Sequence, residues 1–199
     1  GMTIPEEYGG QKLDDISEAI VVEELSRVDA SLGVMVAVHV GLCSMTIALS
    51  GNEEQKKKYL PKLASGEFLG AYSLSEAGSG TDAAAMVAKA TDSGEHFTLN
   101  GEKMWVTNGT TADLFVLFAK VADHPDYGKK SHGGVTCFII EKGFEGFEIG
   151  KKEDKLGIRS SDTCTLVLNN CKVPKENVLG EVGKGFPIAM NALDNSRIG

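Results

Sequence analysis

Two stretches of the sequence predict loops that close on a flat ligand, Tyr72-Ser73-Leu74-Ser75-Glu76-Ala77-Gly78-Ser79-Gly80-Thr81-Asp82 and Met104-Trp105-Val106-Thr107-Asn108-Gly109. The first leaves an apolar strand, Phe68–Leu74, and enters a turn whose backbone N–H groups and hydroxyls suit a phosphate or a polar ring edge. The second offers an apolar face with one hydroxyl donor, which suits a planar heteroaromatic ring. Each stretch alone is equally consistent with an ordinary surface turn, so the prediction depends on their combination.

The composition predicts a globular protein and excludes nucleic acid as a partner. The 199 residues are 42% hydrophobic and 24% charged, which is enough for one large or two modest domains with real cores. The formal net charge is -8, and the sequence has no basic stripe of the kind that binds phosphate backbones. The lysine cluster Lys56–Lys58 follows Glu53 and Glu54 and is typical of a solvated helix face.

The 4 cysteines predict reduced, structural thiols. They form no Cys-x-x-Cys pair and no His-Cys metal spacing. Cys43, Cys137 and Cys164 lie in apolar runs, as buried free thiols commonly do, whereas Cys171 follows two asparagines. We therefore expect a reducing, cytosol-like compartment, and no signal-peptide pattern precedes Pro5.

The uncharged run Ser31–Ser50 is long enough to cross a bilayer. It contains small and polar residues, His39 and Gly41 among them, and acidic rather than basic residues surround it. This pattern favours a buried helix in a large protein or a subunit contact over a membrane span. We expect no membrane association.

Residues 1–66 predict an α-helical domain. Asp14 or Asp15 is expected to cap the first helix, with Glu18 completing a capping box with Asp15. Further helices are expected over Ala30–Leu49 and Glu53–Ala64, the second closed by Ser65-Gly66. One face of the first helix gathers the apolar residues Val21, Val22, Leu25 and Val28.

Residues 67–180 predict an antiparallel β-barrel or sandwich, because the hydrophobic period changes there from helical to alternating. Asn100-Gly101, between His96–Leu99 and Lys103–Val106, is the strongest short hairpin signal. The polar span Asp123–Gly134 is expected to be a mobile loop. The other expected strands are Leu114–Val121, Gly134–Glu141, Phe147–Ile149 and Thr163–Leu168.

Residues 181–199 predict the start of a further helical domain. Val173-Pro174 ends the strand region, Gly180–Gly185 forms a connector, and Phe186–Ile198 has helical spacing. The sequence stops at Gly199 inside that pattern, so we expect the rest of that domain to lie beyond it. The expected fold is multidomain α and β, with a helical domain, a β domain and the beginning of a helical bundle.

Several blocks of sequence, in one order, resemble the acyl-CoA dehydrogenase family along the whole chain. Besides the two loops they are Pro5–Gly10, Asn52–Pro61 and Gly183–Phe186, and the block Gly150–Arg159 is particularly similar to short-chain, butyryl-type members. The resemblance implies a helical N-terminal domain, a β middle domain and a C-terminal four-helix domain. It also implies FAD as cofactor and an acyl-CoA thioester as substrate, with a carboxylate removing the α proton while hydride leaves the β carbon for flavin N5.

The resemblance assigns roles to residues of both loops. Thr107 matches the threonine that donates to flavin N5, Trp105 matches the tryptophan beside the isoalloxazine, and Val106 supplies a backbone contact. Leu74 and Ser75 match residues at the pyrimidine edge, and Tyr72 belongs to the same cofactor stretch. Gly80 and Thr81 match the turn that reaches the pyrophosphate and the pantetheine of the substrate. Ala77 stands where most members have proline.

The catalytic base is not expected within this sequence. Asp194 and Arg197 match an Asp-x-x-Arg near the CoA thioester arm, although a helical i,i+3 ion pair is the common alternative. Ser196 stands where isovaleryl-type and long-chain members carry the catalytic glutamate, so the base should come from a later segment, as in short- and medium-chain members. Glu76 is a weak candidate, and His39 is better interpreted as a hydrogen-bonded core histidine that borders the acyl cavity.

Further expectations follow from the resemblance alone. They are an electron-transfer flavoprotein as electron acceptor, a homotetramer when the protein is full length, side chains of Val36, Val38 and Leu42 limiting acyl length, and the mitochondrial matrix as compartment in a eukaryote. Two other interpretations remain: a non-catalytic module that self-associates through exposed apolar helix surface, and an acyl-CoA oxidase-like relative. Turnover by the chain itself and oxygen reactivity of the reduced flavin would distinguish them.

Overall fold

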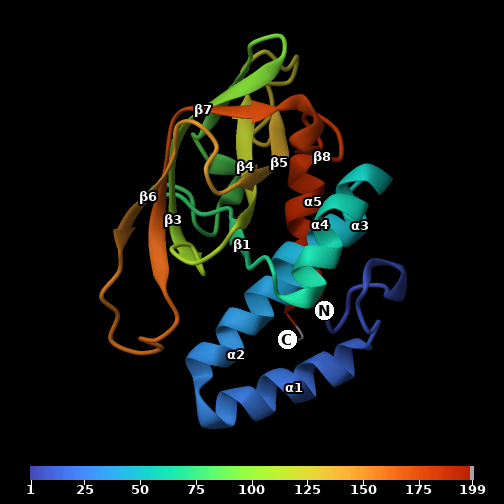
Figure 1. Cartoon of the computed structure of the whole chain (residues 1–199). Helices are drawn as coiled ribbons and strands as arrows, with labels where there is room; N and C mark the ends of the chain where they lie inside the picture. The colour runs from blue at the N-terminus through green and yellow to red at the C-terminus, as the bar shows by residue number, and fades with distance from the viewer. Residues whose placement is uncertain (198–199) are drawn as a thin grey trace.

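The computed structural model describes residues 1–197. Helices at the beginning and the end of the chain pack on one side of a curved sheet (Figure 1). Strands β6 (Phe147–Lys152) and β7 (Thr163–Pro174) form a long ribbon, and the loop that joins them contacts the start of α2 (Ala30–Ala37) through a hydrogen bond from Ser160 Oγ to Asp29 Oδ2 (2.9 Å). The arrangement confirms the predicted helical part followed by a mainly antiparallel β part. The helices are α1 (Asp15–Val28), α2 (Ala30–Ala37), α3 (Met45–Ser50), α4 (Glu53–Ser65) and α5 (Gly185–Ser196), with a π-helical segment η2 (Val38–Ser44) and the 3-10 turns η1 (Glu6–Tyr8), η3 (Ala83–Ala85) and η4 (Lys175–Asn177).

The N-terminal end of α1 is capped by Asp14, whose side chain accepts a hydrogen bond from Ser17 N at 2.8 Å. The expected capping box between Asp15 and Glu18 is therefore wrong, because the helix starts one residue earlier than that pattern requires. The apolar face predicted on α1 is only half-buried, and Val28 at its end is 90% exposed.

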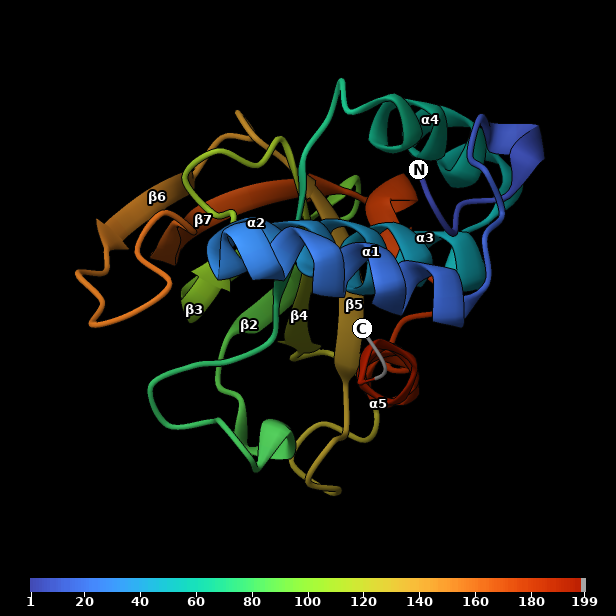
Figure 2. The same ribbon diagram turned by 90° about the horizontal axis from the view of Figure 1, so that it is seen from below.

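The run Ala30–Ser50 is one continuous helix made of α2, η2 and α3. Its middle turn widens to π-helix where the hydroxyls of Ser44 and Thr46 donate to the carbonyls of His39 (2.7 Å) and Leu42 (2.5 Å). The run has 21 residues and a mean hydropathy of 2.1, enough by length and composition to cross a membrane. In the fold it packs against α1, α4, α5 and the strand β1 (Gly70–Ser73), which makes it the central helix of the helical layer (Figure 2).

Helix α4 has the predicted bounds within one residue. Asn52 and Gln55 form a reciprocal capping box at its start, and Gly66 ends it at a φ of 79°, which glycine adopts without steric cost. The Gln55 amide also donates to the carbonyls of Glu176 (2.7 Å) and Val178 (2.8 Å). One side chain therefore caps the helix and fixes it to the β part.

The sheet contains 8 strands in the order β6-β7-β3-β2-β4-β5-β8, with β1 paired to β4 off this path. Pairing is antiparallel except for β1 with β4 and β2 with β4, which are parallel. Strands β4 and β5 match their predictions, whereas β7 is much longer than expected. The strands are β1 (Gly70–Ser73), β2 (Lys89–Asp92), β3 (His96–Thr107), β4 (Leu114–Val121), β5 (Val135–Glu141), β6 (Phe147–Lys152), β7 (Thr163–Pro174) and β8 (Val178–Leu179).

The hairpin predicted at Asn100-Gly101 is wrong, because β3 runs straight through both residues. Gly101 has a φ of 143° at a register shift between β3 and β7, and a methyl group there would lie 2.9 Å from Ala88 Cα. The Asn100 side chain accepts from Asn170 N at 2.9 Å across the strands. The glycine therefore permits a close strand approach at a bulge, and the turn between β2 and β3 instead contains Ser93 and Gly94.

Two apolar clusters cover the two faces of the curved sheet. Alternate residues of β4, such as Val116 and Phe118, face the helices, while Phe115 and Leu117 face the second cluster beneath β3 and β7. All 4 cysteines are buried and free, which confirms the prediction of structural thiols, Cys171 included. Helix α5 packs along β5 (Figure 2). Ile198, the predicted end of α5, lies outside the described residues.

Candidate functional site

One pocket brings together the two loops that the sequence singled out. It has a volume of about 160 Å³, and we call it the β1–β3 pocket. The central helix forms one wall and α5 contributes a single leucine. The residues that line it are Val38, Leu42, Tyr72, Leu74, Ser75, Met104, Trp105, Thr107 and Leu193. Val36, expected beside them, is not among these residues.

A β-bulge near the end of β3 presents Met104 and Trp105 to this pocket. Between Lys103 and Val106, β3 advances by one residue more than β7, and Trp105 adopts a φ of 59°. Tryptophan rarely enters this left-handed region, so the surrounding fold imposes it. The indole is 59% exposed rather than packed in the core, which leaves its face available to a planar ligand.

Hydroxyl groups are the main hydrogen-bonding side chains of the pocket. Within residues 1–197 the hydroxyls of Ser75 and Thr107 have no hydrogen-bond partner, so each is able to donate to a ligand. The Tyr72 hydroxyl is buried instead, 3.5 Å from Ala189 O, and burial raises its pKa. Apolar walls with two free donors suit a flat heteroaromatic ring that has acceptor nitrogens or oxygens at its edge.

Asn108 anchors the end of β3, and sequence reasoning gave it no role. It is fully buried at a φ of 65°, and its amide donates to Met35 O (3.0 Å) and Gly70 O (3.2 Å). These bonds fix the residue after Thr107 to both the central helix and β1. The sequence offered one signal for this anchor, because asparagine tolerates positive φ and Asn108 stands at the predicted end of a strand.

Two charged residues lie buried directly behind the pocket. The Lys103 side chain is 0% exposed and its Nζ lies 2.6 Å from Glu76 Oε1. Burial lowers the pKa of Lys103, and the carboxylate of Glu76 opposes that shift. Because Glu76 is enclosed in this pair, it is not placed to act as a base on a ligand in the pocket. This agrees with its interpretation from the sequence as a weak candidate for the catalytic base.

Other predicted residues lie outside the pocket wall. Gly80 and Thr81 lie in an exposed segment of the first loop, directly after a turn that closes through paired backbone hydrogen bonds between Glu76 and Ser79 (2.9 and 3.1 Å). Val106 is fully buried in the core, so only its backbone is near the pocket. The exposed segment of Gly80 and Thr81 is free to contact a ligand that extends beyond the ring.

The end of α5 carries the remaining predicted residues. Asp194 and Arg197 are exposed, and no ion pair joins them in the described part of the chain. The i,i+3 pair that the spacing allows is therefore absent from residues 1–197, and both side chains are free for other contacts. Their neighbour Leu193 reaches the β1–β3 pocket, which places the end of α5 beside it.

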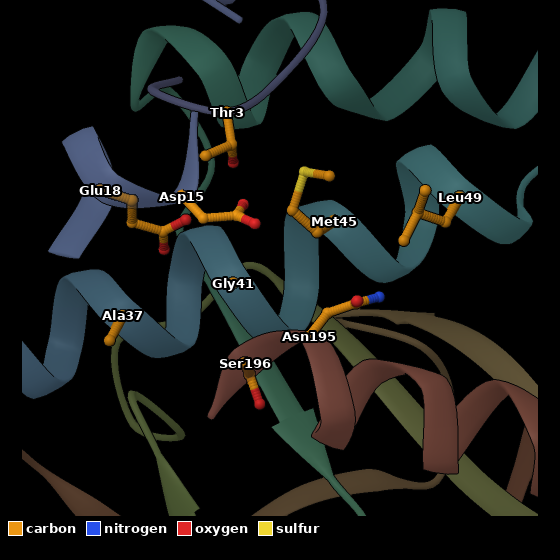
Figure 3. A pocket seen from close by; sticks show the side chains of 9 residues that line it. All are labelled: Thr3, Asp15, Glu18, Ala37, Gly41, Met45, Leu49, Asn195 and Ser196. Carbon is orange, nitrogen blue, oxygen red and sulfur yellow. The ribbon is translucent and has the colours of Figure 1, made fainter. Parts of the chain in front are cut away.

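A second pocket, of about 200 Å³, lies between α1, the central helix and the end of α5 (Figure 3). Burial raises the pKa of the Glu18 carboxyl, and neighbouring Asp15 raises it further. A methyl group on Gly41 would lie 3.4 Å from Glu18 Oε1 and 3.8 Å from Ser196 Cβ, so both side chains approach this glycine. This pocket contains none of the residues predicted to bind a cofactor.

His39 is a structural histidine, as predicted. Its Nε2 lies 3.1 Å from Leu63 O, and its Nδ1 accepts a hydrogen bond from Gly70 N at 3.0 Å. This pair of partners specifies a neutral ring with the proton on Nε2. Burial lowers the pKa of His39, which agrees with that assignment.

The sequence and the fold both match known proteins. A family model described as "Acyl-CoA dehydrogenase, N-terminal domain" matches residues 1–67, and one described as "Acyl-CoA dehydrogenase, middle domain" matches residues 71–171. A short-chain specific acyl-CoA dehydrogenase of Clostridium acetobutylicum is 50% identical over 199 residues, covering 100% of this chain and 51% of that protein. The mitochondrial isovaleryl-CoA dehydrogenase of Solanum tuberosum is 48% identical over 198 residues, covering 100% and 47%.

Two solved structures extend the comparison to the fold. Butyryl-CoA dehydrogenase from Megasphaera elsdenii superposes with a TM-score of 0.93 at 44% identity, covering 99% of this chain and 51% of that chain. Acyl-CoA dehydrogenase complexed with FAD from Bacillus anthracis gives 0.90 at 46% identity, covering 99% and 32%. The chain thus spans about half the length of the curated relatives it matches.

Proposed function

Because the chain belongs to the acyl-CoA dehydrogenase family, we propose that it forms the FAD-binding part of an enzyme that oxidises acyl-CoA thioesters to 2-enoyl-CoA. The observation that supports this most is the β1–β3 pocket, where Ser75, Trp105 and Thr107 converge from two separate loops. FAD is the cofactor of a similar solved structure. Its isoalloxazine supplies the hydride acceptor that α,β-dehydrogenation needs.

The residues present fit such a ring. We assign the Thr107 hydroxyl as donor to flavin N5, and the exposed indole of Trp105 as the flat surface beside the isoalloxazine. Ser75 and Leu74 then contact the pyrimidine edge, with Tyr72 behind them and Val106 contributing backbone. The free hydroxyls orient the ring, and the apolar wall of Val38 and Leu42 excludes water from the reacting carbons.

Parts of both ligands lie beyond the pocket in this proposal. Gly80 and Thr81, in the exposed segment after the Glu76–Ser79 turn, would bind the pyrophosphate and the pantetheine side of the substrate. Asp194 and Arg197, which form no ion pair within residues 1–197, contact the CoA thioester arm from α5. The two ligands then meet at the pocket.

The general base belongs to another part of the parent protein. Neither a carboxylate nor a histidine lines the β1–β3 pocket in the described chain. Ser196, where isovaleryl-type members carry the base, is a serine here and faces the second pocket (Figure 3). A base must reach the α carbon of the substrate, so the chain by itself is expected to be inactive.

We propose a short, straight acyl chain as the preferred substrate. Identity does not decide this, since the short-chain and the isovaleryl relatives are 50% and 48% identical. The residue at position 196 supports it instead, because isovaleryl-type and long-chain members carry the catalytic glutamate there and this chain has a serine. We further propose an electron-transfer flavoprotein as the physiological acceptor and a homotetramer as the assembled form, both from the family.

The test is reduction of the flavin in the parent protein. Butyryl-CoA should bleach the flavin band under anaerobic conditions faster than isovaleryl-CoA does. Thr107→Ala should lower the reduction rate by about ten-fold or more, as loss of one preorganised donor does. Thr107→Ser is the matched control, because it keeps the hydroxyl. An alanine variant with unchanged spectrum and rate would contradict the N5 role, and rapid reoxidation of the reduced flavin by oxygen would indicate an oxidase.

A second candidate function is self-association of the chain without catalysis. Helix α1 exposes three large apolar side chains, Ile16 (71%), Ile20 (55%) and Val28 (90%), which offer apolar surface for contact between copies of the chain. Light scattering over a concentration series tests it, with Ile20→Lys as the variant expected to restore the monomer. This behaviour is compatible with the enzyme assignment, whereas turnover by the chain alone would show the missing-base argument to be wrong.

A further inference from the structure

The buried pair Glu76 and Lys103 lies at the junction of the two pocket loops. Glu76 directly follows Ser75, and Lys103 directly precedes Met104 and Trp105. Their side chains are 4% and 0% exposed, yet neither lines the β1–β3 pocket. The pair is therefore adjacent to the ligand-facing residues in the chain but is hidden behind them.

Hydrogen bonds from this pair tie three backbone segments together. Lys103 Nζ donates to Glu76 Oε1 (2.6 Å) and to Leu74 O (3.1 Å). The carboxylate also accepts from Val87 N (2.6 Å) and Ala88 N (3.1 Å), on the segment that leads into β2. The strand β3, the first loop and the entry to β2 are thus fixed to one another.

A backbone bond continues this link to the pocket wall. Met104 N donates to Ser75 O at 2.9 Å, so the loop that carries Ser75 and the bulge that carries Trp105 are joined directly. A buried ion pair is seldom more stabilising than apolar residues of the same volume, but it specifies geometry because each of its bonds is directional. At this place the specified geometry is the spacing between Ser75 and Trp105.

We propose that Glu76 and Lys103 are positioning residues, which hold the two loops at the separation that the flavin ring requires. The inference rests on the proposed flavin site. Neither side chain contacts the ring; both act through the backbone of Ser75, Met104 and Trp105. Removing the pair widens or shifts the gap between the loops, so flavin affinity falls even where the protein remains folded.

The test measures FAD affinity in Glu76→Gln, Lys103→Met and the double variant E76Q/K103M. The double variant has no buried charge and is the one most expected to fold. Trp105 is the only tryptophan of the 199 residues, so quenching of its emission by FAD reports binding at the pocket itself. Each variant should raise the dissociation constant by about ten-fold or more, because small misplacements of a binding group are costly.

Two controls separate positioning from stability. Val173→Ala removes buried apolar volume from β7 opposite Phe97, at the other end of β3 from Trp105, and should lower the melting temperature while leaving FAD affinity within about two-fold. The exchanged pair E76K/K103E restores the opposite charges but turns an ammonium toward the N–H groups of Val87 and Ala88, so it should not restore affinity. A double variant E76Q/K103M with the affinity of the wild type would overturn the proposal.

Hydrogen exchange on the unmodified protein tests the same link without a substitution. The amides of Val87 and Ala88 should exchange as slowly as those of the central strands, although the Val87 side chain is 81% exposed. Fast exchange at both would refute the positioning role even if every variant failed to fold. If instead FAD never quenches Trp105 in the wild type while these amides are protected, the flavin site is wrong and the loop link stands.

Discussion

Replacing Asn108 with alanine removes the anchor between β3, the central helix and β1. The amide donates to Met35 O and Gly70 O at 3.0 and 3.2 Å, from a backbone with a φ of 65°. Loss of the donor costs about 1 kcal/mol for each carbonyl. Alanine enters the left-handed region less readily than asparagine, which adds roughly 1 kcal/mol. We expect the free energy of unfolding to fall by about 3 kcal/mol.

Urea unfolding followed by Trp105 emission and circular dichroism measures this loss. Asn108→Gly is the matched variant, because it loses the same bonds without the left-handed penalty. The greater freedom of glycine in the unfolded chain offsets part of that gain, so it should be more stable than the alanine variant by about 0.5 kcal/mol. A loss below about 1 kcal/mol for alanine, or glycine as the less stable of the two, would refute the reasoning.

Two further predictions concern the same framework. His39 is neutral in the fold because Nδ1 accepts from Gly70 N, and burial lowers its pKa. The unfolded chain therefore binds more protons than the folded one below the ordinary histidine value of about 6.5, so stability should fall as pH drops from 7 to 5; His39→Gln should lack this slope in urea titrations. Gly101→Ala should cost at least about 2 kcal/mol through its φ of 143° and its contact with Ala88. Gly128→Ala, at a φ of 73° with no atom within 4 Å, should cost less, and equal losses would contradict the steric account.

Local patterns predicted the elements whose signals are local. The capping residues Asn52 and Gly66 delimit α4, and a short, almost uninterrupted apolar run delimits β4, because caps and apolar runs act within a few residues. The prediction of a hairpin at Asn100-Gly101 was wrong because the conformation there does not depend on local sequence. Its backbone is determined by contacts with Ala88 and Asn170, which are close only in the folded chain.

In the candidate site, too, local features were predictable from the sequence and features set by distant residues were not. Ser75, Trp105 and Thr107 were found through the order of motifs, and the structure brings them into one pocket. The buried state of Lys103 was not predictable, since its partner Glu76 is distant in sequence and a lysine in a strand ordinarily indicates a solvated face. The bulge at Trp105 was not predictable either, because the extra residue in β3 is recognised only from the pairing of β3 with β7.

The central claim is that the β1–β3 pocket holds the flavin ring. A crystal structure of the parent protein grown with FAD tests it most directly. The account predicts the isoalloxazine beside the Trp105 indole, with N5 within about 3.2 Å of the Thr107 hydroxyl. Flavin density in another place, such as the pocket beside Glu18, or a Thr107 hydroxyl directed away from N5, would contradict it.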